Sequence, residues 1–244
     1  MVNYIKSEFL KQKKRFTLKL LWLSPLIPIA LSIILMGGDY FTEGAFNWWY
    51  TLILPGSLSM IVAFTVSGEK KHNRHGLFAV CINKKILWLS QIFMNTILLL
   101  SVNLIYFVFM IVMGAFFGIH VPFTDSLAAS FVLFLTFTWQ IPVFMFISEK
   151  ISSFSSIIIS LVCNMGFGIF FATTKLWFVP FAIPARLMCP IIKVLPNGLP
   201  LPAGHHLSDN RVILTGLIIT SGLYFIFSLI TTLWFNKREV TNYK

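Results

Sequence analysis

Six stretches without a charged residue, each at least 19 residues long, dominate this sequence of 244 residues. They cover residues 20–38, 44–68, 86–124, 126–148, 151–174 and 212–236. The hydrocarbon core of a bilayer is about 30 Å thick and a helix rises about 1.5 Å per residue, so roughly 20 apolar residues cross it. Each stretch is therefore predicted to form one membrane-spanning helix, with 86–124 as a single long helix.

Composition excludes a soluble domain, because only 11% of the residues are charged and 57% are hydrophobic. A soluble domain carries about 25% charged residues. The net charge of +11 would suit nucleic acid, but most Lys and Arg residues lie in short connectors beside apolar stretches, which is typical of membrane topology signals. The three cysteines (Cys81, Cys163, Cys189) form neither a disulfide framework nor a zinc motif. An integral membrane protein remains.

The distribution of positive charge predicts the orientation. Fifteen Lys and Arg residues fall in the N-terminal segment, connector 68–85, the connector after the fourth stretch and the C-terminal segment, against four in the other connectors. By the positive-inside rule both termini are predicted to be cytoplasmic. The first stretch is longer than the apolar region of a signal peptide, so it is interpreted as a retained helix.

Three segments outside the stretches complete the predicted fold, an all-α membrane domain over residues 1–244. Residues 1–19 mix Lys and Arg with apolar side chains, which favours an amphipathic interfacial helix on an anionic inner leaflet. Segment 68–85 is the longest cytoplasmic connector. Segment 175–211 is external, and its many prolines predict short re-entrant helices rather than a further span.

Catalytic motifs are missing from the sequence. It contains no phosphate-binding GxxxxGK[ST] loop, no HExxH and no GxSxG, and all eight acidic residues lie outside the six stretches. Ion-coupled carriers usually place ionisable groups inside the membrane. We therefore expect no enzyme, no bound cofactor and no metal site, and any transport energy should come from another subunit.

Polar amides near the middles of three stretches are the candidate translocation-path residues: Asn103, Gln140 and Asn164. An amide in the membrane must find a hydrogen-bond partner. The amides either tie helices together or face a path for cargo, and the sequence leaves both roles open.

Three stretches of sequence carry a family resemblance: FNWWYTLILPG at 46–56, GEKKHNRHGLF at 68–78 and IPARLMCPIIKVLPNGLP at 183–200. Together with six spans, the chain resembles the ABC-2 (type V) exporter permeases. Within that group it is similar to the E-type and G-type membrane subunits of lantibiotic self-immunity transporters, and the first stretch favours E-type. The resemblance implies two copies of a separate ATPase subunit that uses ATP and Mg²⁺, and a second permease, identical or different.

The resemblance makes segment 68–85 a cytoplasmic coupling helix that docks on the ATPase. The residues themselves favour docking, because charged side chains can orient a partner and an apolar pair can anchor it. The alternative is a solvated basic loop that only fixes topology. The candidate coupling residues are Glu69, Lys70, Lys71, Arg74, Leu77 and Phe78.

The leading functional hypothesis is a permease in a bacterial cell membrane that expels a lantibiotic or similar cationic antimicrobial peptide and thereby gives immunity. Asp39 and Glu43 lie near Trp48 and Trp49 on the predicted external side, and these four are candidate contacts for a basic peptide. Ordinary hydration and membrane anchoring are the alternative for each. Another cargo (a lipid, drug or antibiotic) and a non-transporting scaffold or sensor are the alternative functions.

Overall fold

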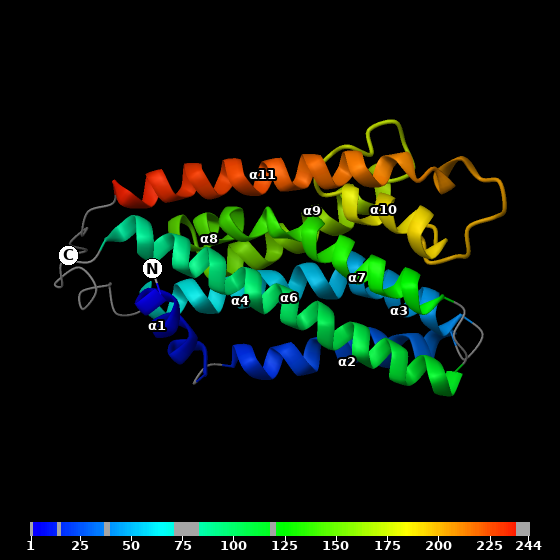
Figure 1. Ribbon diagram of the computed structural model, residues 1–244, viewed down its shortest axis with the longest axis horizontal. Coiled ribbons are helices and arrows are strands. Elements are labelled where there is room, and N and C mark those ends of the chain that lie inside the picture. The colour runs from blue at the N-terminus through cyan, green and yellow to red at the C-terminus, as the bar shows by residue number, and fades with distance from the viewer. Residues whose placement is uncertain (1, 14–15, 37–39, 71–82, 118–120, 238–244) are drawn as a thin grey trace.

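The computed structural model describes residues 2–13, 16–36, 40–70, 83–117 and 121–237, and this part of the protein is almost entirely helical. Most helices lie side by side along the long axis, with α1 across one end and α10 near the opposite end (Figure 1). The helices are α1 (Val2–Lys13), α2 (Thr17–Met36), α3 (Phe41–Trp48), α4 (Leu54–Lys70), α6 (Lys84–Phe117), α7 (Phe123–Thr138), α8 (Gln140–Lys150), α9 (Ser153–Phe171), α10 (Ile183–Ile192) and α11 (Arg211–Asn236).

In the described part of the chain, five helical segments are long and apolar enough to cross a membrane, and the bent pair α7–α8 makes a sixth if it is one span. The prediction of a multi-pass helical membrane protein is confirmed at this level. The long third stretch is one helix, α6, as predicted. The end of α11 lies at the same end of the bundle as α1 (Figure 1).

The second span is continuous from Phe41 to Gly68 but changes its helix type on the way. Between α3 and α4, residues Trp49–Ile53 form a π-helix, in which the Leu54 amide donates to Trp49 O. Pro55 follows and has no amide hydrogen to donate, so the ordinary ladder cannot close at this point. Such π segments are frequent at functional sites.

The fourth span is broken, which the sequence analysis did not predict. Helices α7 and α8 meet at Trp139 with a bend of 41°. Pro142 accounts for the break, because its nitrogen cannot donate to the carbonyl of Thr138, the last residue of α7. Trp139 itself is buried and packs edge-on against Phe181.

Two of the three segments predicted outside the spans differ from expectation in their bounds. The interfacial helix predicted over 1–19 ends at Lys13, and residues 17–19 belong to α2. In segment 175–211, predicted to be re-entrant, residues 175–182 form turns, Ile183–Ile192 form α10 and His206–Ser208 form a short 3₁₀-helix. Helix α10 is almost completely buried against α7, α9 and α11.

Large aromatic side chains fill the core and join distant helices. The Trp49 ring stacks on Tyr106, which links the π segment to α6. Trp88 stacks on Phe235 and donates to Thr231 Oγ1 at 3.1 Å, which links α6 to α11. The outer faces are apolar too: Phe170 and Phe225 are 73% and 70% exposed. Lipid can cover such an apolar surface, whereas the same surface exposed to water would cause the protein to aggregate.

Candidate functional site

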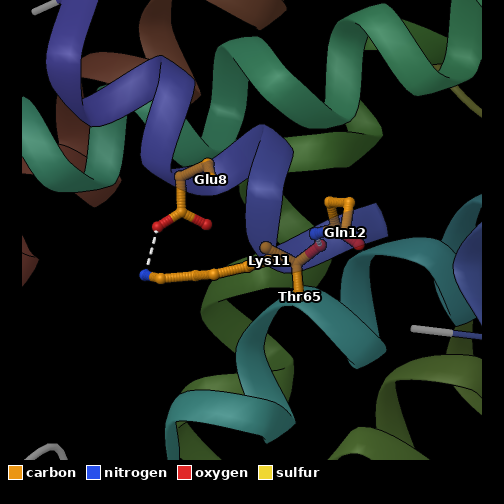
Figure 2. Close-up of polar contacts among 4 residues, drawn as sticks. All are labelled: Glu8, Lys11, Gln12 and Thr65. Carbon is orange, nitrogen blue, oxygen red and sulfur yellow. Dashed lines mark hydrogen bonds and ion pairs between the residues drawn. The ribbon is translucent and has the colours of Figure 1, made fainter. Parts of the chain in front are cut away.

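Helix α1 buries two polar side chains against the bundle and exposes two large apolar ones, while its Tyr4 is half-buried and packs against the core. Glu8 and Gln12, one turn apart, are each only 1% exposed, while Phe9 and Leu10 are 57% and 56% exposed. Figure 2 shows Glu8, Lys11 and Gln12 on α1 beside Thr65 of α4. The inward polar face needs polar partners, since a buried amide or carboxylate without them is destabilising.

Gln12 begins a chain of side-chain hydrogen bonds across three helices, which we call the amide–hydroxyl chain (Gln12, Thr65, Asn95). Gln12 Nε2 donates to Thr65 Oγ1 at 2.9 Å, and Thr65 Oγ1 donates to Asn95 Oδ1 at 3.0 Å. Asn95 Nδ2 donates to the Gln91 carbonyl at 2.8 Å. The chain joins α1, α4 and α6 at the end of the bundle where connector 68–85 leaves α4.

Glu8 forms an ion pair one turn away from Gln12. Its Oε1 lies 2.6 Å from Lys11 Nζ, and the Lys11 side chain is 29% exposed (Figure 2). A carboxylate this deeply buried requires a partner, and Lys11 is one. The ion pair lies within α1, so it compensates the buried charge without joining α1 to another helix.

The predicted coupling residues lie just beyond this chain. Glu69 and Lys70 are the last two residues of α4. Lys71, Arg74, Leu77 and Phe78 lie outside the described residues, as does Asp39 among the predicted peptide contacts. Their roles remain predictions.

The three mid-span amides are all buried, and each has a partner. Gln140 and Asn164 form a reciprocal pair, with Nε2 to Oδ1 at 2.9 Å and Nδ2 to Oε1 at 3.0 Å. Asn103 accepts from Trp49 Nε1 at 3.3 Å and donates to Leu99 O at 2.9 Å. These bonds connect α8 with α9, and the π segment with α6. A role in a translocation path remains a prediction.

The described residues among the predicted peptide contacts lie at the α10 end of the bundle, but they differ in how exposed they are. Trp48 and Glu43 are half-buried, but Trp49 is fully buried, so contact with a peptide through Trp49 would require the bundle to open. Glu43 lines an open cavity of about 280 Å³ together with Asp125. The other lining residues are Val121, Pro122, Ile191, Ile192, Lys193, Pro200 and Leu201. Two carboxylates therefore face this cavity, with one lysine.

Arg186 is a buried, positively charged residue within α10. Its Nη1 donates to the Leu207 carbonyl at 2.7 Å, and burial lowers the pKa of the guanidinium. One turn later, burial raises the pKa of the Cys189 thiol to about 11. Arg186 thus ties α10 to the segment that leads into α11.

Sequence reasoning missed the α1 contribution to this site. Glu8 and Gln12 are four residues apart and share a helix face, which is a detectable signal. Thr65 and Asn95 are polar residues within apolar stretches, yet their sequence separation of 30 gives no indication that they meet. A search among the described residues finds no group of three or more His, Cys, Asp or Glu side chains that could hold a metal ion.

Comparison with protein families, with curated proteins and with solved structures finds no match to this chain.

Proposed function

We propose that this chain is the permease subunit of an ATP-driven ABC exporter that removes a lantibiotic or similar cationic peptide from a bacterial cell membrane. The proposal joins the sequence resemblance to the distribution of charge in the bundle. The energy for export comes from a separate ATPase subunit, and two permeases enclose the path.

The distribution of charge in the spans carries the proposal. Among the described residues, every charged side chain of a spanning helix lies within three residues of a helix end. Lys19, Glu43 and Asp125 are the third residues of α2, α3 and α7. Proton- and sodium-coupled carriers hold ionisable groups inside the membrane. The distribution of charge therefore favours a permease driven by a separate ATPase over an ion-coupled carrier.

The two ends of the bundle support an assignment of sides. The described lysines at the α1 end are Lys6, Lys11, Lys13, Lys19, Lys70, Lys84, Lys85, Lys150 and Lys237, and the sequence of connector 68–85 contains further basic residues. Among the described residues, the α10 end holds four Lys and Arg side chains and the cavity with Glu43 and Asp125. The α1 end is proposed to face the cytoplasm and the ATPase, and the carboxylates to face the released basic peptide.

The test is to tag the chain, purify it in mild detergent from its native membranes after cross-linking, and add radiolabelled 8-azido-ATP. We expect label on a co-purifying subunit and none on this chain. Charge reversal at Lys70, Lys71 and Arg74 should release that subunit. Reversal at Lys150 and Lys237, which are exposed at the same end, is the matched control and should not.

Growth of the host in cationic lantibiotics gives the second readout. Both deletion of the gene and the triple reversal should lower resistance. Recruitment of a subunit without ATP-dependent export would indicate a scaffold instead, and unchanged lantibiotic resistance with altered export of a lipid or drug would indicate another cargo. Label on this chain itself would overturn the proposal.

A further inference from the structure

The open cavity at the α10 end of the bundle has walls that are tied to one another. One wall is a short hairpin after α10, in which Leu201 N donates to Lys193 O at 2.7 Å. Asn47 Nδ2 donates to the Pro196 carbonyl of this hairpin at 3.0 Å. Asn47 lies one turn after Glu43 on α3, so this bond joins the hairpin to the helix that carries the first carboxylate. The cavity of about 280 Å³ is therefore part of the fold.

The two carboxylates of this cavity are not neutralised within the described part of the chain. Glu43 and Asp125 are half-buried, and each accepts a hydrogen bond from the hydroxyl of the preceding threonine, at 2.9 and 3.2 Å. Lys193 lines the same cavity, but neither carboxylate lies within 4.0 Å of a described basic side chain. The second oxygen of each carboxylate is thus available to a ligand, and the cavity has an excess of negative charge.

The rest of the cavity wall is apolar, which favours an organic cation over a metal ion. Val121, Ile192 and Leu201 line it, with prolines beside them. A calcium or magnesium ion takes oxygen ligands and gains nothing from such a wall. A cation with a hydrocarbon stem matches both parts, because its charge can meet the carboxylates while its methylene groups cover the apolar surface.

The hydrogen bonds to the carboxylates favour an ammonium over a guanidinium. A guanidinium pairs best with both oxygens of one carboxylate, and here one oxygen of each is already bonded to a threonine hydroxyl. An ammonium has three donors that rotate about a flexible stem, so it can take one oxygen from each of two carboxylates.

We propose that this cavity binds one lysine side chain of the cationic peptide, with the ammonium at Glu43 and Asp125 and the stem on the apolar wall. Lys193 is exposed beside the cavity and opposes the entry of a second positive charge. The site rests on the proposed export function for the origin of its ligand, but its binding of the ligand requires no ATPase.

The test uses the purified chain in nanodiscs of phosphatidylcholine, which carry no net charge and do not compete for the probe. Saturation-transfer difference NMR measures the binding of Nα-acetyl-lysine methylamide and of its arginine and norleucine analogues. The lysine probe should bind, the arginine probe should bind more weakly, and the uncharged norleucine probe should not bind. Absence of lysine binding, equal binding of norleucine, tighter binding of arginine, or displacement of the lysine probe by an equimolar amount of calcium would overturn the proposal.

Variants locate the probe within the cavity. Glu43→Gln and Asp125→Asn should each weaken binding of the lysine probe about fivefold, the change expected for one partly exposed ion pair. Lys193→Asn should strengthen binding, because a repulsive charge is lost and asparagine tolerates the left-handed backbone of this position (φ 55°). Asp209→Asn is the matched control, since it removes an exposed carboxylate outside the cavity, and it should leave binding unchanged.

An effect of Asp209→Asn as large as that of Glu43→Gln, or weaker binding by Lys193→Asn, would also overturn the site. Its failure is distinguishable from failure of the export proposal. The probe assay contains neither ATP nor ATPase, so absence of binding would leave the photolabelling of a co-purifying subunit unchanged. Absence of such a subunit would in turn leave binding of the lysine probe unchanged.

Discussion

The Gln140–Asn164 pair shows how this chain accommodates polar side chains within its spans. Each amide donates one hydrogen bond to the other and accepts one in return, at 2.9 and 3.0 Å. Asn164 also donates to the Ser160 carbonyl at 2.8 Å. Interhelical bonds of this kind in membranes contribute about 0.6 kcal/mol on average, with a maximum of about 1.7. The pair therefore specifies how α8 meets α9 more than it stabilises them.

Replacement of Gln140 by leucine should destabilise the fold by about 1 kcal/mol, because Asn164 loses its reciprocal partner. The double variant Gln140→Leu/Asn164→Leu should lose less than the sum of the single variants, since no amide is left unpaired. Unfolding in detergent, followed by tryptophan fluorescence, measures both. Strict additivity would contradict the pair. Loss of export with unchanged stability would assign these residues to a path.

Cys189 should resist alkylation in the folded chain, because burial raises its pKa to about 11. At pH 8 only about one thiol in a thousand would be ionised, and the thiolate is the reactive form. Stability should fall as pH rises from about 9 towards 11, since the unfolded thiol ionises first and the folded one does not. Iodoacetamide labelling with mass spectrometry tests this; rapid modification of Cys189 at pH 8 in the folded chain would contradict it.

The sequence alone predicted which polar side chains would need partners in the membrane. It did not predict which residues those partners would be. Asn103, Gln140 and Asn164 stand out in apolar stretches, and all three are buried and bonded. Their partners come from helices 24 and 54 positions away, and a separation of that size carries no pairing information. Gln12 was missed because a polar residue in a basic segment is expected to be solvated.

At the scale of helices, proline positions explain two departures from the regular pattern. Pro142 breaks the fourth span at Trp139, and Pro55 follows the π segment of the second. Pro25 and Pro28 lie inside α2, which continues through them. Proline identity thus indicates where a span can deform, but neighbouring helices decide whether it does. For this reason the existence of the spans was predictable from sequence, whereas the 41° bend was not.

Helix α10 packs closely on α11 at Gly216. A Cβ atom there would lie 2.9 Å from Leu187 Cδ1 and 3.0 Å from Ile183 Cγ2, too close without movement of both side chains. Gly216→Ala should therefore destabilise the fold by about 1–3 kcal/mol, the usual effect of overpacking.

Gly222→Ala is the matched control, since it lies on the same helix and a Cβ there meets no atom within 4 Å. This variant should be neutral or slightly stabilising, because alanine favours a helix more than glycine does. Thermal unfolding of both purified variants measures the difference. Equal midpoints would contradict the close packing of α10 on α11.

The whole molecule is a bundle whose two ends differ in charge and in structure. One end holds α1, its buried glutamate and most of the described lysines. The other holds α10, buried Arg186 and the cavity of Glu43 and Asp125. The sequence predicted that the two ends would differ in charge, because the Lys and Arg residues in each connector can be counted from the sequence alone. It did not predict that α10 would be a core element, since a short helix with two prolines has no span-like signature.

The central claim is that the spans separate a cytoplasmic α1 end from an external α10 end. Single cysteines at Ser7, Lys237 or Leu199, in a chain without its native cysteines, test it through labelling of intact cells by a membrane-impermeant maleimide. Leu199→Cys, at an exposed position beyond α10, should label in intact cells. Ser7→Cys and Lys237→Cys should label only after permeabilisation. Labelling of all three from one side, or the reverse pattern, would contradict the account.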